Sequence, residues 1–142
     1  MQIWKTKPQL ELMNSYNSKT IHGVLGIEFT AIGPDYLEAS MPVDHRTHQP
    51  AGLLHGGASA VLAESLGSMA SALAKDPQMN MVVGIEINAS HLRGARDGSV
   101  YGRVKPVRLG RSLHVWEIQI RESEALDSPL ICVSRLTVML RS

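Results

Sequence analysis

Two stretches near the start of the chain alternate apolar and polar residues, which is the period of a β-strand. They are Val24–Ile32 and Tyr36–Val43, and Gly33-Pro34-Asp35 between them is a turn signal. We therefore predict a β-hairpin. Before it, Gln9–Ser18 places apolar residues at helical spacing and predicts a short helix.

A long stretch of small and apolar residues occupies the middle of the chain. Gly56–Ala74 contains one charged residue, Glu64, and Lys75-Asp76-Pro77 after it is a helix stop. Apolar residues occur nearly all round this predicted helix, which is typical of a helix buried on most sides. The polar, Pro- and Gly-containing segment Asp44–Leu54 before it predicts a loop.

The second half of the chain predicts four further strands joined by short turns. They cover Met81–Leu92, Ser99–Leu109, Leu113–Arg121 and Leu130–Leu140. Short connections favour antiparallel pairing, because parallel neighbours need long crossovers. The pattern predicts an α+β fold, an antiparallel β-sheet wrapped around one long central helix, in one domain over residues 1–142.

Composition excludes several classes of protein. The 14 basic and 13 acidic side chains give a net charge of +1, without the basic excess of a nucleic-acid-binding protein. Cys132 is the only cysteine, so no intrachain disulfide can form. The first ten residues lack the apolar core of a secretory leader, and no apolar run is long enough to span a membrane. We expect a soluble, cytoplasmic protein.

His55-Gly56-Gly57 at the start of the predicted helix is the strongest local signal for chemistry. Glycines there allow close backbone approach, and the first N–H groups of a helix stabilise negative charge. This is the requirement for an oxyanion hole in acyl transfer. A plain turn and helix cap is the alternative interpretation.

Glu64 is the second signal, because a carboxylate on a buried helix is costly unless it is paired or protonated. Its alternative is a position on a solvated edge of the helix. Ser68, four residues later, shares its helix face, where its hydroxyl orients a water or simply allows close packing. Gly56 and Glu64 lie about 12 Å apart along the axis. A site that uses both is therefore easier to build from two subunits of a symmetric dimer.

Other candidate sites have weaker support. The histidines do not have a metal-ligand spacing, and no paired cysteines or acidic cluster points to a metal. Cys132 lies in an apolar strand, where a buried inert thiol is expected. Several arginines follow the helix, with Arg108-Leu109-Gly110-Arg111-Ser112 as the densest part. They predict either solvated strand edges or a phosphate-binding patch.

Three blocks in order make the chain similar to a known family. They are Pro50–Ser59 with its His-Gly-Gly, Leu62–Ser65 with Glu64, and Gly84–Arg93. The sequence resembles the hotdog-fold acyl-CoA thioesterases, more narrowly the PaaI-like group with its bacterial aromatic acyl-CoA hydrolases. The resemblance covers nearly the whole chain and implies the hotdog fold.

The resemblance also implies roles for individual residues. Glu64 would be the general base or the nucleophile, and the Gly56 N–H would polarise the thioester carbonyl. His55 would shape that site, with Gln49 near the thioester and Ser68 as the helix hydroxyl. The positions implied to contact coenzyme A are Gly84, His91, Leu92, Arg93, Gly94, Arg108, Leu109, Gly110, Arg111, Ser112 and Leu113.

The resemblance implies an acyl-CoA substrate and no separate cofactor or metal, because CoA is part of the substrate. Aromatic acyl groups such as 1,4-dihydroxy-2-naphthoyl, or aryl groups on an acyl carrier protein, are the expected substrates. Family members are homo-oligomers, dimers of dimers with sites at the dimer interface. The alternative function is a non-catalytic acyl-CoA-binding or sensing module, and a dehydratase using His55 and Glu64 is a third.

Overall fold

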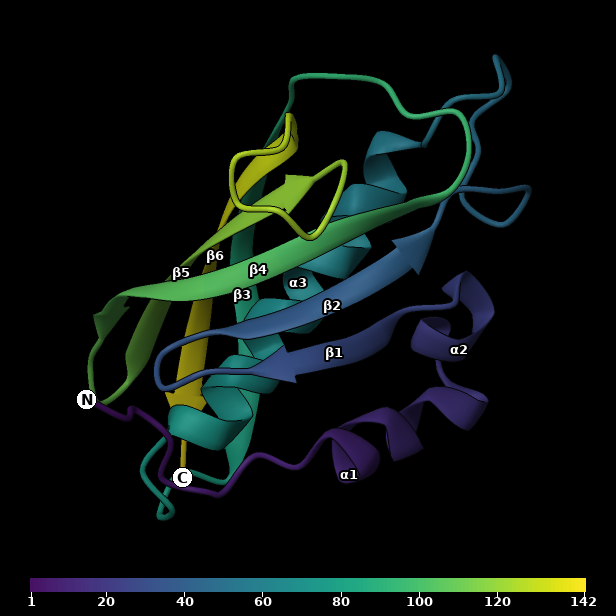
Figure 1. Cartoon of the computed structure of the whole chain (residues 1–142). Coiled ribbons are helices and arrows are strands. Elements are labelled where there is room, and N and C mark those ends of the chain that lie inside the picture. The colour runs from purple at the N-terminus through teal and green to yellow at the C-terminus, as the bar shows by residue number, and fades with distance from the viewer.

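The computed structural model describes all 142 residues and contains one six-stranded antiparallel sheet (Figure 1). The strands run β1–β2–β4–β5–β6–β3 across the sheet. Their bounds are β1 Glu28–Ile32, β2 Leu37–Pro42, β3 Met81–His91, β4 Ser99–Leu109, β5 Leu113–Arg121 and β6 Leu130–Arg141. The predicted α+β class, the order of elements and the antiparallel pairing are confirmed.

The central helix α3 covers Gly56–Ala74, the range that its composition predicts. It packs against one face of the sheet, and Leu62, Leu66 and Ala70 on it are fully buried. Two glycines allow the close approach. A Cβ at Gly67 would lie 2.5 Å from Leu136 Cδ2, and one at Gly102 would lie 2.7 Å from Leu66 Cδ1.

The N-terminal segment differs from the prediction. The helix expected over Gln9–Ser18 is α1 (Leu10–Ser15) followed by the 3₁₀ helix η1 (Tyr16–Lys19). The strand expected from Val24 begins only at Glu28, because Ile21–Leu25 forms the short helix α2. Gly26 ends α2 with a φ of 73°, a left-handed conformation that reverses the chain into β1. Of the residues predicted to start the strand, Val24 and Leu25 lie in this helical turn, and Val24 is exposed.

Strand β3 forms one free edge of the sheet and carries exposed apolar residues. Met81 and Ile85 are each about half exposed (51% and 52%), and Val83 is 36% exposed. A long apolar edge strand is a template for pairing with another chain. None of the helices is both long enough and apolar enough to cross a membrane.

A buried polar cluster joins α3 to β5. Trp116 Nε1 donates to Ser71 Oγ at 2.7 Å, and His114 Nδ1 lies 3.0 Å from the same oxygen. Burial lowers the pKa of His114 below its usual value, and the positive charge of Lys5 lowers it further. The predicted buried thiol is also confirmed, and burial raises the pKa of Cys132.

Candidate active site

The start of α3 presents a backbone amide without an acceptor. His55 is the N-cap, and its Nδ1 accepts from Gly57 N–H at 2.7 Å. Ala58 N–H and Ser59 N–H both donate to the His55 carbonyl. Gly56 N–H is thus left without an acceptor in the chain. His55 therefore forms the helix cap of the alternative interpretation, and the oxyanion role of Gly56 stays a prediction that the free amide permits.

Gly56 lines a cavity of about 390 Å³, open to solvent, at this end of the helix. A Cβ on Gly56 would lie 2.6 Å from His91 Nε2, so the imidazole lies directly against the glycine. The cavity also brings together predicted site residues from the loop before α3 and from the end of β3 and the segment after it: Gln49, His91, Leu92, Arg93 and Gly94. Loop and segment are tied by the hydrogen bond from Leu54 N–H to the Ala95 carbonyl at 2.8 Å.

Glu64 lies two helical turns further along α3, in a different and larger groove. The groove has a volume of about 550 Å³ and is open to solvent. Ser68 lines it beside Glu64, as their spacing predicts. The expectation of a buried Glu64 is wrong for the single chain, because the side chain is exposed and has no hydrogen-bond or ion-pair partner. Glu64 faces the edge strand β3, where a Cβ on Gly84 would lie 2.6 Å from Glu64 Oε2.

The predicted site residues therefore fall into three places in one chain. Gly56 and its neighbours share one cavity, and Glu64, Ser68 and Gly84 lie together elsewhere along α3. The third place is the β4–β5 turn, where Leu109, Gly110 and Arg111 line a pocket with the N-terminal residues. This turn is an entire β4 strand, about 33 Å, from the segment at Gly94. A single chain does not bring the three groups together.

The residues that sequence reasoning missed come from the N-terminal segment. His22 Nε2 lies 2.8 Å from Ser65 Oγ, and both residues line the Glu64 groove. Burial lowers the pKa of His22. A search for hydrogen-bonding residues next to Glu64 would have pointed to Ser65. His22 carried no signal, because only the tertiary fold brings α2 against α3.

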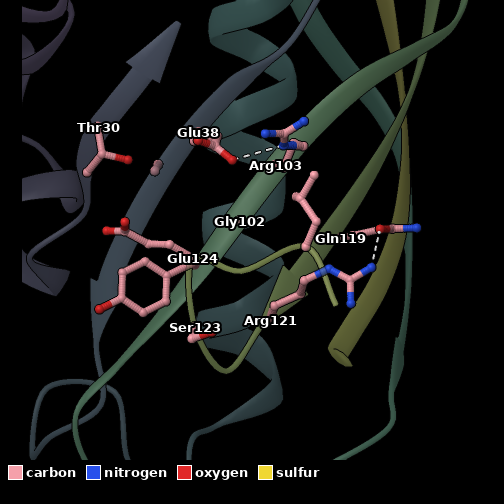
Figure 2. Close-up of a pocket in the computed structure, with 11 residues that line it drawn as sticks. Thr30, Glu38, Gly102, Arg103, Gln119, Arg121, Ser123 and Glu124 are labelled. Atoms are coloured by element: carbon pink, nitrogen blue, oxygen red, sulfur yellow. Dashed lines mark hydrogen bonds and ion pairs between the residues drawn. The ribbon is translucent and has the colours of Figure 1, made fainter. Parts of the chain in front are cut away.

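A further pocket, on the other side of the sheet, contains none of the predicted site residues (Figure 2). Two of its four charged side chains, Arg103 and Glu38, form an ion pair, and Arg121 donates to neutral acceptors. Arg103 Nε donates to Glu38 at 2.9 Å, and Arg121 donates to Gln119 at 3.0 Å. The first contact joins β4 to β2, and the second lies within β5.

A free amide at a helix N-terminus and a free carboxylate on the same helix suit the hydrolysis of an activated ester. The amide stabilises an oxyanion, and the carboxylate activates water or attacks directly. No group of three histidine, cysteine or acidic side chains is arranged to hold a metal ion. A helix with these groups, wrapped by an antiparallel sheet, is the arrangement of a hotdog-fold thioesterase.

Comparison with known proteins gives the same class. The model of the thioesterase superfamily matches residues 51–127. A 1,4-dihydroxy-2-naphthoyl-CoA hydrolase of Escherichia coli is 52% identical, with 95% of this chain and 96% of that protein covered. The proofreading thioesterase EntH of Cronobacter turicensis is also 52% identical, over the same shares of the two chains. The crystal structure of a mutant thioesterase from Pseudomonas aeruginosa has a TM-score of 0.91 and 48% identity, covering 99% of each chain.

The chain belongs to the thioesterase superfamily, with the hotdog fold. It is an enzyme, a thioester hydrolase.

Proposed function

We propose that this enzyme hydrolyses aromatic acyl-CoA thioesters to the free acid and coenzyme A. The observation that carries the proposal is that one helix holds both an amide without an acceptor, Gly56 N–H, and a carboxylate without a partner, Glu64. The name of the E. coli relative, an aromatic acyl-CoA hydrolase, supports an aryl group. An aryl group on an acyl carrier protein has the same reacting bond and is the alternative carrier.

In the proposed reaction, the thioester carbonyl oxygen accepts a hydrogen bond from Gly56 N–H. Glu64 takes a proton from water while the water oxygen attacks the carbonyl carbon. The tetrahedral oxyanion then collapses, the C–S bond breaks, and the CoA sulfur leaves and is protonated. If Glu64 attacks directly, an anhydride forms with loss of the thiol, and water hydrolyses it. His55 holds the helix start in place, and Gln49 and Ser68 supply polar contacts beside the reacting group. No metal or separate cofactor has a role in either route.

We further propose that each site is shared by two copies of the chain. Gly56 would come from one copy and Glu64 from its partner, because the two open into separate pockets within one chain. The exposed apolar edge of β3 beside Glu64 is the surface suited to pairing the copies. A dimer of such dimers is the proposed assembly, in the cytoplasm, with residues 1–142 as one catalytic domain.

The arginines in two of the three groups are proposed to bind the CoA phosphates. Arg93 lies beside the Gly56 cavity, and its Nε is 3.9 Å from Glu122, too far for a hydrogen bond. Arg111 lies on the β4–β5 turn, and a partner copy would have to bring it near the same ligand. Guanidinium groups suit phosphate, because they donate two parallel hydrogen bonds.

Replacing Glu64 tests the proposal. We expect Glu64→Gln to lower kcat by about a hundredfold or more, with a KM within a few-fold of wild type, because the amide cannot take a proton. Thiol release from benzoyl-, hydroxybenzoyl-, dihydroxynaphthoyl- and fatty acyl-CoA gives both parameters. Near wild-type turnover in this variant would contradict the role of Glu64. Tight binding of every ester without thiol release by the wild type would instead favour the sensing module.

A further inference from the structure

The outer wall of the Glu64 groove is built by the N-terminal segment. Half of the residues lining the groove come from this segment: Thr6, Lys7, Gln9, Leu12, Met13, Tyr16 and His22. The family match begins only at residue 51, after this segment. The wall beside Glu64 therefore lies outside the residues that the family model matches, although the relatives at 52% identity cover 95% of the chain, and specificity can differ there without change to the catalytic helix.

The composition of the groove indicates which part of the substrate occupies it. Met13, Met69 and Leu73 give it an apolar lining, and Lys7 is the only lysine or arginine in it. The arginines implied to bind coenzyme A lie in the other two pockets. With the thioester at Glu64, the phosphate-bearing arm extends toward the arginines, and the acyl group occupies the apolar groove.

Among the polar residues that line the groove, His22 and Ser65 form a hydrogen-bonded pair. His22 Nε2 lies 2.8 Å from Ser65 Oγ, and Ser65 is the residue next to Glu64. The other ring nitrogen, His22 Nδ1, is buried without a partner, as is Asn17 Oδ1 on the preceding helix η1. An unpaired buried polar atom is unfavourable, and a leucine at position 22 would avoid it. An imidazole held here at the expense of stability is typical of a functional position.

In the His22–Ser65 pair, the Ser65 hydroxyl keeps the capacity for one further hydrogen bond. Because burial lowers its pKa, His22 is neutral at physiological pH and its ring carries one hydrogen. If Nε2–H donates to Ser65 Oγ, the serine O–H remains free to donate. If the serine donates to Nε2, its oxygen remains free to accept. In either tautomer one hydrogen-bonding function of Ser65 is left for a hydroxyl group, which can both donate and accept.

We propose that His22 is a specificity-determining positioning residue: by fixing the Ser65 hydroxyl at the wall of the groove, it favours acyl groups that carry a hydroxyl substituent. This rests on the proposed function, because it needs the acyl group of a thioester at Glu64. The serine contacts the substituent, and the histidine acts through the serine.

The test compares benzoyl-CoA with the three hydroxybenzoyl-CoA isomers, measured as kcat/KM by thiol release. We expect the wild type to favour one hydroxylated ester over benzoyl-CoA. Ser65→Ala and His22→Leu each lower that ratio about tenfold, the usual effect of losing one hydrogen bond, and the loss falls on the hydroxylated ester. The double variant is no worse than either single one, because both remove the same contact.

Two further variants separate this role from a structural one. In His22→Gln the side-chain amide reaches the place of Nε2, so it restores the selectivity that His22→Leu loses. Ser18→Ala, an exposed serine on the same segment, leaves the ratio at its wild-type value. An unchanged ratio in Ser65→Ala overturns the proposal. So does an equal rise in KM for all four esters, which would place the CoA arm in the groove.

A binding measurement distinguishes failure of this inference from failure of the proposed function. In Glu64→Gln protein, calorimetry gives Kd for the same esters without hydrolysis. The Kd ratio between benzoyl- and hydroxybenzoyl-CoA should change with Ser65→Ala and His22→Leu as the kinetic ratio does. If binding shows a preference for a hydroxylated ester but the kcat/KM values do not, the result contradicts the proposed catalytic role of Glu64 and leaves the role of His22 intact. A Kd ratio unaffected by either substitution contradicts the role of His22.

Discussion

Gly56 and His91 show how one missing side chain shapes the candidate oxyanion site. The imidazole of His91 occupies the space that a Cβ on residue 56 would need, 2.6 Å from the ring nitrogen. The amide of the same residue is the one without an acceptor at the helix start. The absence of a side chain at Gly56 therefore lets the His91 imidazole approach the helix start and keeps the Gly56 N–H accessible.

We predict that Gly56→Ala lowers kcat/KM by about a hundredfold, because the methyl group displaces His91 or shifts the amide by about 1 Å. Steady-state thiol release measures the loss, and far-UV circular dichroism checks that the fold is kept. The double variant Gly56→Ala/His91→Ala should be little worse than His91→Ala alone, since the clash is then absent. Losses that simply multiply would show that the methyl group acts independently of the ring.

His114 predicts a pH dependence of stability. Its pKa is lowered in the folded protein by burial and by Lys5, whereas the unfolded chain titrates near pH 6.5. Above pH 6.5 His114 is neutral in both the folded and the unfolded state, so it does not reduce the free energy of unfolding. Below it the unfolded state binds a proton that the folded state resists, so the free energy of unfolding falls.

Urea unfolding at pH 7.5 and pH 5.5 measures this effect in the wild type and in His114→Gln. We expect the variant to lose less stability than the wild type between the two pH values. The variant still loses some stability between these pH values, because the lowered pKa of His22 acts in the same direction. Equal losses in the two proteins would show that His114 titrates alike in both states.

At the scale of elements, the packing of α3 on the sheet depends on small residues at the contact. Gly67 lets the helix approach β6, where Leu136 is fully buried and has no exposed side on which to move. Alanine is the better helix former by about 1 kcal/mol, but inserting a methyl group into a packed core costs about 1–3 kcal/mol.

We therefore predict that Gly67→Ala lowers the free energy of unfolding by up to about 2 kcal/mol. Chemical denaturation gives the value. In a Leu136→Ala background the same substitution should cost nothing or stabilise the protein, because the new methyl group fills part of the vacated space. If Gly67→Ala destabilises the wild type and the Leu136→Ala variant equally, a residue other than Leu136 clashes with the new methyl group.

At the scale of the whole molecule, the distribution of site residues leads to a prediction about subunits. If each site combines Gly56 of one copy with Glu64 of the other, a heterodimer of Glu64→Gln and Gly56→Ala chains has one site with both changes and one intact site. We predict about half of the wild-type activity for that heterodimer, although each homodimer is nearly inactive.

Co-expression of the two chains with different affinity tags, followed by two purification steps, isolates the heterodimer for the thiol-release assay. The control is the heterodimer of Glu64→Gln with wild type, which also retains one intact site and should show the same half activity. A Glu64→Gln/Gly56→Ala heterodimer as inactive as its homodimers would place each complete site in one chain.

Sequence periodicity determined most of the fold. The range Gly56–Ala74 was predictable because a long run of small and apolar residues ends at a proline-containing stop. The strands Ser99–Leu109 and Leu113–Arg121 were predictable because alternation is local. The strand predicted from Val24 was wrong over its first residues, since Val24 and Leu25 fit a helical turn as well as a strand.

Local sequence also indicated Gly56 and Glu64, because a glycine pair at a helix start and a lone charge on an apolar helix are visible without the fold. Only the tertiary structure decided which residues surround them. It placed His91 against Gly56, and α2 with His22 against Ser65, through contacts between segments far apart in sequence. It also left Glu64 exposed, because burial depends on what packs beside the helix, and β3 ends the sheet there.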